Sequence, residues 1–192
     1  IPYAIWYLML FIIPYIYYKK DKLSTLVSID VINPLKKIKE DILLISYASY
    51  LTDLVSQILK QTNDKNIYDD YINGLLKIEE GLNPVVITNI LEVKLLDYLG
   101  VGLNLTSCIM CGNKKEIVTL SSEKGGLICK NCYTNERIVP ISIVKILNMY
   151  YLVDIKSINK LAIKEDVISE INKFLTSYYD DYTGLYLKSK DF

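Results

Sequence analysis

The segment that decides the fold contains two cysteine pairs, Cys108-Ile-Met-Cys111, which precedes Gly112, and Cys129-Lys-Asn-Cys132. Two CxxC pairs separated by about 15–20 residues form a zinc-binding pattern. The two residues inside each pair let both thiolates turn toward one ion, and the glycine lets the backbone turn back toward the sulfurs. Because four thiolates complete a tetrahedral shell, we expect a structural Zn²⁺ site without a position for activated water.

Disulfide bonds and coincidental core cysteines are the alternatives to a zinc site. Nothing in the sequence indicates secretion, and a chain of 192 residues with a helical core does not need covalent cross-links. Binding of such an ion contributes about 10–16 kcal/mol in zinc-finger peptides, which is enough to fold a small module. The pattern therefore favours zinc.

Residues 103–137 read as a small inserted zinc ribbon, because short β-branched pieces and glycine turns surround the cysteines. The expected hairpin has strands at 116–120 and 126–129 and a turn at 123–125. A zinc centre with four thiolates carries a net double-negative charge. Basic side chains near the site either offset this charge or contact nucleic acid, and both interpretations stay open. These residues are Lys114, Lys115, Lys124 and Lys130.

The segments on both sides of the module show apolar residues three or four positions apart, which is typical of amphipathic helices. One break precedes them at Asn33-Pro34. Gly81, Gly100 and Gly102 end helices, and Pro84 suits a first helical turn. The expected helices cover 38–59, 67–78, 84–99, 143–150 and 167–178. They predict a helical domain over 33–192 into which the ribbon is inserted.

Residues 1–18, IPYAIWYLMLFIIPYIYY, contain no charged side chain. A membrane span is one interpretation, but spanning helices need about 20 apolar residues, and Pro2 and Pro14 interrupt this run. Its tyrosine, isoleucine and phenylalanine content favours buried β-strands near a proline turn. The chain starts at Ile1 without methionine, and we expect the natural protein to extend upstream.

Tyrosines and lysines lie side by side at the end of this segment. Tyr15, Tyr17 and Tyr18 precede Lys19 and Lys20, a combination that domains binding single-stranded DNA use. The favoured alternative is that alternate tyrosines face a barrel core, because successive strand residues point to opposite faces. A second basic cluster, more typical of a solvated face, contains Lys36 and Lys37.

Composition excludes several functional classes. Hydrophobic residues make up 51% of the chain, as in globular proteins. The 22 basic residues balance 22 acidic ones, so no global field attracts a polyanion and any nucleic-acid contact must be local. No histidine is present, which excludes an imidazole-based hydrolase and a mixed Cys/His metal site.

On these residues the chain resembles the RecO family of bacterial recombination mediators. The likeness covers nearly all of it. Residues 38–51 (IKEDILLISYASYL) resemble the first long helix of the family, and 95–100 (LLDYLG) the helix before the zinc module. The most specific parts are 108–112 (CIMCG) and 120–132 (LSSEKGGLICKNC). The ending at 179–192, in which a Lys-Ser pair precedes a terminal aromatic residue, is similar as well.

The resemblance implies a non-catalytic protein that binds single- and double-stranded DNA and anneals complementary strands. It implies that RecR and this protein together help RecA to displace single-strand-binding protein, whose C-terminal tail family members bind. Family members begin with an OB-fold barrel, of which only the last strands correspond to residues 1–32. The missing part of the barrel leaves apolar strand faces in 3–18 exposed, which favours aggregation.

We therefore expect a mainly helical α+β protein. It consists of an OB-fold remnant at 1–32 and a helical bundle at 33–192 with a four-cysteine zinc ribbon inserted at 103–137. We expect a cytoplasmic, nucleoid-associated DNA repair protein that is not an enzyme. The alternative is a membrane-anchored zinc-ribbon adaptor. A metal-dependent enzyme is disfavoured, because four closed thiolates leave no open coordination position.

Overall fold

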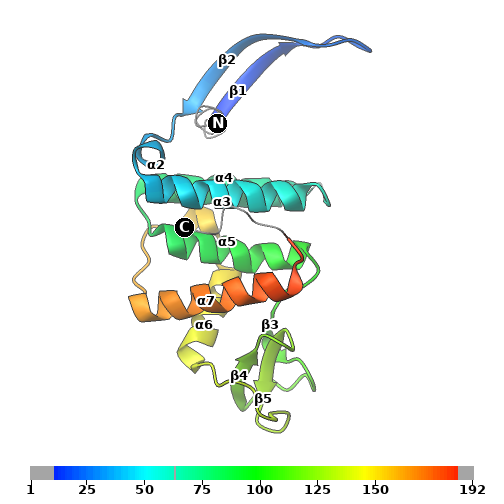
Figure 1. Ribbon diagram of the computed structural model, residues 1–192, viewed down its shortest axis with the longest axis vertical. Helices are drawn as coiled ribbons and strands as arrows, with labels where there is room; N and C mark the ends of the chain where they lie inside the picture. The colour runs from blue at the N-terminus through cyan, green and yellow to red at the C-terminus, as the bar shows by residue number, and fades with distance from the viewer. Residues whose placement is uncertain (1–10, 63, 186–192) are drawn as a thin grey trace.

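The computed structural model describes residues 11–62 and 64–185. It confirms a mainly helical α+β fold. A body of α-helices lies between a two-stranded hairpin at one end and a small three-stranded sheet at the other (Figure 1). The helices are α2 (Lys36–Glu40), α3 (Ile42–Leu59), α4 (Lys65–Glu80), α5 (Pro84–Tyr98), α6 (Ile141–Leu152) and α7 (Glu165–Tyr182). A short 3₁₀ helix, η1 (Ile155–Ser157), follows α6.

The first predicted helix is two helices. A single helix was expected over 38–59, but the chain breaks at Asp41, whose backbone is extended at φ −121°. The Asp41 carboxylate accepts the backbone N–H of Leu43 at 2.8 Å and of Leu44 at 3.4 Å, and so caps the N-terminus of α3. The apolar spacing continues across this break, so the pattern alone conceals it.

The ends of α4 and α5 follow the sequence signals. Gly81 adopts φ 103°, and its N–H bonds to the carbonyl of Ile78 while that of Leu82 reaches Lys77. This left-handed glycine cap ends α4 as predicted. The Asn83 side chain accepts the backbone N–H groups of Val85 and Val86 and so caps α5, and Pro84 occupies the first turn of this helix.

Helix α5 is the centre of the body and contacts α3, α4, α6 and α7. A single apolar face was predicted for it. This was wrong, because α5 is buried almost all round, including Thr88, Asn89 and Glu92. The hydroxyl of Tyr50 in α3 donates to the Glu92 carboxylate, and that of Tyr179 in α7 donates to the Glu92 carbonyl at 2.9 Å. Three helices are thereby joined at one buried acidic residue.

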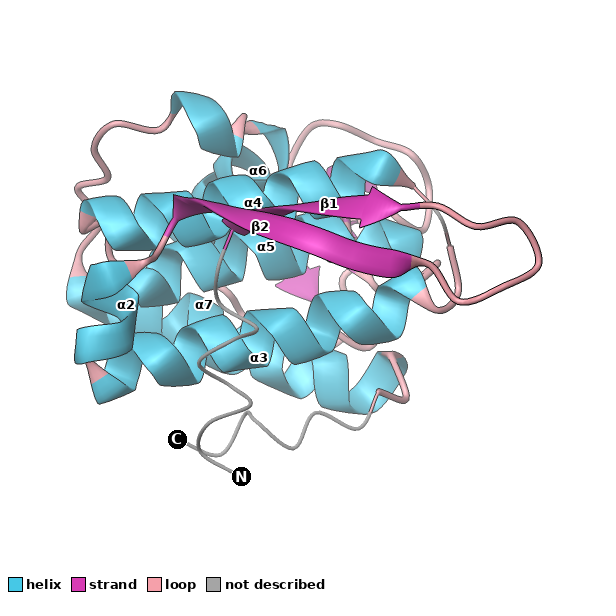
Figure 2. Cartoon of the chain, turned by 90° about the horizontal axis from the view of Figure 1, so that it is seen from above, coloured by secondary structure: helices cyan, strands magenta, loops and turns pink. Residues whose placement is uncertain are grey.

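Strands β1 (Phe11–Tyr17) and β2 (Thr25–Asn33) form an antiparallel hairpin that stands off the helices (Figure 1) and, seen from above, crosses over them (Figure 2). Buried strands were predicted here. For the described side chains at 14–18 this was wrong, since all are exposed, including Tyr15 at 48% and Tyr17 at 65%. Ile16 pairs with Leu26 and is exposed as well. Residues 1–10 of the predicted strand region lie outside the described residues. The OB-fold origin of the hairpin stays a prediction.

The junction between hairpin and helices is anchored by Leu35, which is fully buried and adopts a left-handed φ of 46°. Its N–H donates to the Asn33 side chain at 2.8 Å. Next to it, the Glu79 carboxylate of α4 accepts the amides of Lys37 at 3.1 Å and Ile38 at 3.0 Å. The start of α2 is therefore held by a side chain from another helix.

Among the described residues, α3 is long and apolar enough to cross a membrane by length and composition alone, with a mean hydropathy of 1.4. Core helices of folded proteins pass the same test. Six residues of α3 are buried in the helical body, namely Ala48, Tyr50, Leu51, Leu54, Val55 and Ile58. The membrane span considered for residues 1–18 lies mostly outside the described part of the chain.

Candidate metal centre

The cysteines belong to a three-stranded sheet between α5 and α6 and to the turns that follow two of its strands. Strand β5 (Gly126–Cys129) is central, with β4 (Ile117–Ser121) antiparallel on one side and β3 (Asn104–Cys108) parallel on the other. The predicted hairpin at 116–129 is confirmed, whereas β3 was not predicted. Gly126 permits the close approach of β3, because a Cβ there would lie 2.9 Å from that of Asn104.

Backbone hydrogen bonds shape both cysteine pairs into tight turns. In the first turn, the N–H of Cys108 bonds to the carbonyl of Asn113, and that of Gly112, at φ 74°, bonds back to Cys108, both at 2.8 Å. In the second, the N–H groups of Cys132 and Tyr133 share the carbonyl of Cys129 at 3.0 Å. Each turn brings its two sulfurs to the same side.

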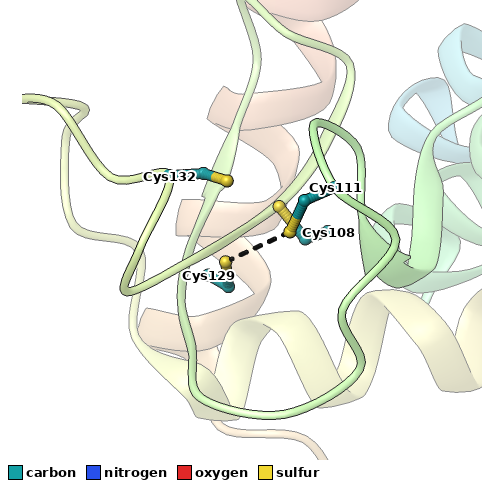
Figure 3. A group of neighbouring side chains, drawn as sticks. All are labelled: Cys108, Cys111, Cys129 and Cys132. Atoms are coloured by element: carbon teal, nitrogen blue, oxygen red, sulfur yellow. Dashed lines mark hydrogen bonds between the residues drawn. The ribbon is translucent and has the colours of Figure 1, made fainter.

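The four sulfur atoms converge on one point (Figure 3). All lie within 4.8 Å of one another, and those of Cys111 and Cys129 are 3.6 Å apart. Zinc–sulfur bonds of about 2.3 Å in a tetrahedron require sulfurs about 3.8 Å apart, so the donor set fits a four-thiolate ion. All four cysteines are free, and 3.6 Å exceeds the disulfide bond length of about 2.05 Å.

Burial and proximity set the ionisation of the thiols. Burial disfavours the Cys108 thiolate, but the backbone N–H groups of Cys129, Cys111 and Met110 outweigh it and lower the pKa of Cys108 to about 6. Hydrogen bonding with the sulfurs of Cys111 and Cys129 raises the pKa of Cys132 to about 12. The cluster thus resists full ionisation on its own. A bound divalent cation favours all four thiolates and releases their protons.

The four lysines predicted near the site differ in their surroundings. Lys124 pairs with Glu136 across 2.5 Å, and this contact lowers the pKa of the Glu136 carboxyl well below its usual range. The positive charge of Lys124 is therefore paired within the ribbon. Lys114, Lys115 and Lys130 are exposed on the ribbon. The N–H of Lys130 bonds to the carbonyl of Glu116 at 2.9 Å, which places these three lysines along neighbouring segments.

The remaining predicted DNA-contact lysines lie elsewhere. Lys19 and Lys20 are exposed at the tip of the β1–β2 hairpin, and Lys36 and Lys37 are exposed at the start of α2. The hairpin and the ribbon occupy opposite ends of the molecule (Figure 1). The structure therefore does not bring the predicted lysines into one surface.

A cleft with a volume of about 410 Å³ lies between the ribbon and α7, and no sequence pattern predicted it. Its wall includes Phe174 and Lys173 of α7 and the segment 134–140. That segment is fixed to β4 because the Thr119 hydroxyl donates to the Arg137 carbonyl at 2.7 Å and accepts the Val139 N–H at 2.9 Å. Arg137, the only arginine of the chain, was the one available signal.

Comparison with known proteins agrees with the resemblance. The family model for the C-terminal region of recombination protein O matches residues 39–191. The chain is similar to the DNA repair protein RecO of Bacillus pumilus, at 32% identity over 177 residues, 88% of this chain and 68% of that protein. It is 32% identical over 180 residues to the RecO of Exiguobacterium sibiricum, covering 92% and 72%. The RecO of Listeria monocytogenes serotype 4a is 29% identical over 174 residues, covering 88% and 68%. The chain therefore belongs to the RecO family of DNA repair proteins.

Proposed function

We propose that this protein is a non-catalytic mediator of recombinational repair. It binds single- and double-stranded DNA, anneals complementary strands, and together with RecR assists RecA loading onto DNA coated with single-strand-binding protein. The observation that carries the proposal is the similarity to RecO proteins across most of the chain, which includes the helical body and the cysteine module. The protein acts in the cytoplasm, at the nucleoid.

The metal in this proposal is Zn²⁺ with a structural role. Four sulfurs with a tetrahedral spacing suit a soft-ligand ion and leave no position for substrate or water. Zinc holds β3 and the β4–β5 hairpin together, because each cysteine pair joins a different part of the sheet. Its ligands are Cys108, Cys111, Cys129 and Cys132.

DNA contact in this proposal is shared between separate basic groups rather than one face. Residues 1–32 belong to an OB-fold domain and residues 33–192 to the helical domain with the ribbon at 103–137. Exposed lysines on both parts lie within reach of phosphates. On the ribbon these are Lys114, Lys115 and Lys130, and on the other part Lys19, Lys20, Lys36 and Lys37.

Strand annealing tests this function directly. Two complementary oligonucleotides, each coated with single-strand-binding protein, are mixed with the purified chain, with and without RecR. We expect salt-sensitive DNA binding and faster annealing than the spontaneous rate. The function is also tested by expression in a bacterium that lacks its own RecO, where survival of DNA damage should rise. The proposal is wrong if the chain binds neither DNA nor RecR at low salt and also fails to raise the survival of that bacterium.

A further inference from the structure

The cleft between the ribbon and α7 combines an aromatic wall with cations at its rim. Its volume of about 410 Å³ lies in the range of about 300–1,000 Å³ typical of ligand sites. Phe174 is half-buried in the wall, next to apolar Val139 and Ile143. The side chains of Arg137 and Lys173 are 86% and 71% exposed at the opening. A ring in the wall and cations outside suit a group that is flat and apolar at one end and anionic at the other.

The acidic residues of the cleft differ in how completely their charge is neutralised. The Glu136 side chain is only 6% exposed and accepts bonds from Lys124, from the hydroxyl and N–H of Thr134, and from the N–H of Asn135. Its charge is therefore satisfied inside the module. Glu123, on the β4–β5 turn, is exposed to solvent.

Glu170 is the acidic residue that competes with an anionic ligand. Its carboxylate lies 3.4 Å from the Arg137 guanidinium and 3.7 Å from the Lys173 ammonium. Both contacts are long and solvent-exposed, so they are weak. A phosphate can displace Glu170 and take both cations, because charge-assisted bonds to phosphate are shorter and stronger.

We infer that this cleft binds one nucleotide of single-stranded DNA. The base lies against Phe174, the adjacent phosphate contacts Arg137 and Lys173, and Glu170 holds these cations when the cleft is empty. A base inside a duplex is not available for such a contact, so the cleft distinguishes single strands from duplexes. The inference rests on the proposed DNA binding and names a site for it that does not include the hairpin lysines or Lys114, Lys115 and Lys130.

Anisotropy of fluorescein-labelled (dT)15 and of a labelled 15-base-pair duplex tests the site in the full chain. Phe174→Leu keeps an apolar wall but removes the ring, and we expect about tenfold weaker (dT)15 binding, the usual size of one base–aromatic stack. Duplex binding by the same variant should stay unchanged, which controls for misfolding. Arg137→Ala should weaken (dT)15 binding and reduce the salt slope by about 0.7.

Glu170→Gln should change the affinity for (dT)15 in the opposite direction. Removing the competing carboxylate should tighten (dT)15 binding about threefold at low salt, because both cations are then free for phosphate. Glu165→Gln, at the first residue of the same helix, changes the net charge equally and lies outside the cleft lining. It should leave the affinity near that of the unmodified chain. Lys160→Ala is the matched control for Arg137→Ala, because it also removes one positive charge and lies outside the cleft lining.

The results separate this site from the general function. If the unmodified chain binds no DNA, the proposed function and this site are both wrong. If it binds (dT)15 but the three cleft variants match their controls, the site alone is wrong. The site is also wrong if the variants alter only the binding of an acidic peptide ending in phenylalanine, since the cleft is then a peptide site.

Discussion

Cys129→Ser should release the metal and unfold the ribbon while the helical body stays folded. Cys129 is fully buried on the central strand of the sheet, and its sulfur lies 3.6 Å from that of Cys111. A serine hydroxyl stays protonated at neutral pH and does not replace a thiolate ligand. We expect about one equivalent of zinc in the unmodified protein and almost none in the variant.

The magnitude follows from the small size of the ribbon. The aliphatic side chains on its strands that are at most 5% exposed are Leu105, Leu120, Leu127 and Ile128. At about 1.5–3 kcal/mol each, these four contribute about 6–12 kcal/mol together. Zinc binding in finger peptides contributes about 10–16 kcal/mol. A zinc ion bound by the four cysteines would therefore stabilise the ribbon at least as much as its apolar side chains do, and its loss would leave too little to hold three short strands.

Hydrogen exchange with mass spectrometry measures this effect by region. In Cys129→Ser, amides at 104–139 should lose protection, while those of α3, α4 and α5 keep it, because their core is formed among the helices. Ser107→Ala, next to a ligand, is the matched control and should retain both zinc and protection. A zinc-free variant with native protection over 104–139 would refute a structural metal. Loss of protection throughout the chain would refute an independent ribbon.

Three further substitutions test the helical body by urea unfolding. Glu79→Ala removes the carboxylate that accepts the α2 amides, and we expect a loss of about 1 kcal/mol, typical of a lost cap; an unchanged midpoint contradicts this. Tyr50→Phe removes the hydroxyl that donates to Glu92, at a cost of about 1.5–3 kcal/mol for a bond to a charged group. Tyr68→Phe, at an exposed ring, is its control and should have almost no effect. Gly81→Ala puts a Cβ on a residue at φ 103° and should cost about 1 kcal/mol; a gain in stability would show that the left-handed cap is absent.

Local signals were enough to predict most of the fold. The helix ends at Gly81 and Pro84 follow from backbone restrictions of single residues, and the ribbon hairpin follows from two cysteine pairs and a glycine turn between them. Each of these features depends on residues close together in the chain. For the same reason, the convergence of the four sulfurs could be expected from spacing alone.

Features that depend on distant residues were missed. Strand β3 pairs in parallel with β5, about twenty positions further on, and no local pattern indicates such a pairing. The burial of Glu92 depends on tyrosines from two other helices, so its sequence neighbourhood suggests an ordinary exposed position. The cleft beside Phe174 likewise forms only when the ribbon meets α7.

The exposed hairpin has a consequence for how the chain responds to proteases. A hairpin of two strands is marginally stable by itself, and the described side chains of β1 and most of those of β2 are in contact with water. Its tip carries Lys19, Lys20 and Lys22, each a cleavage site for trypsin. Brief digestion should therefore cut the chain there first and leave a resistant fragment that contains α2 to α7.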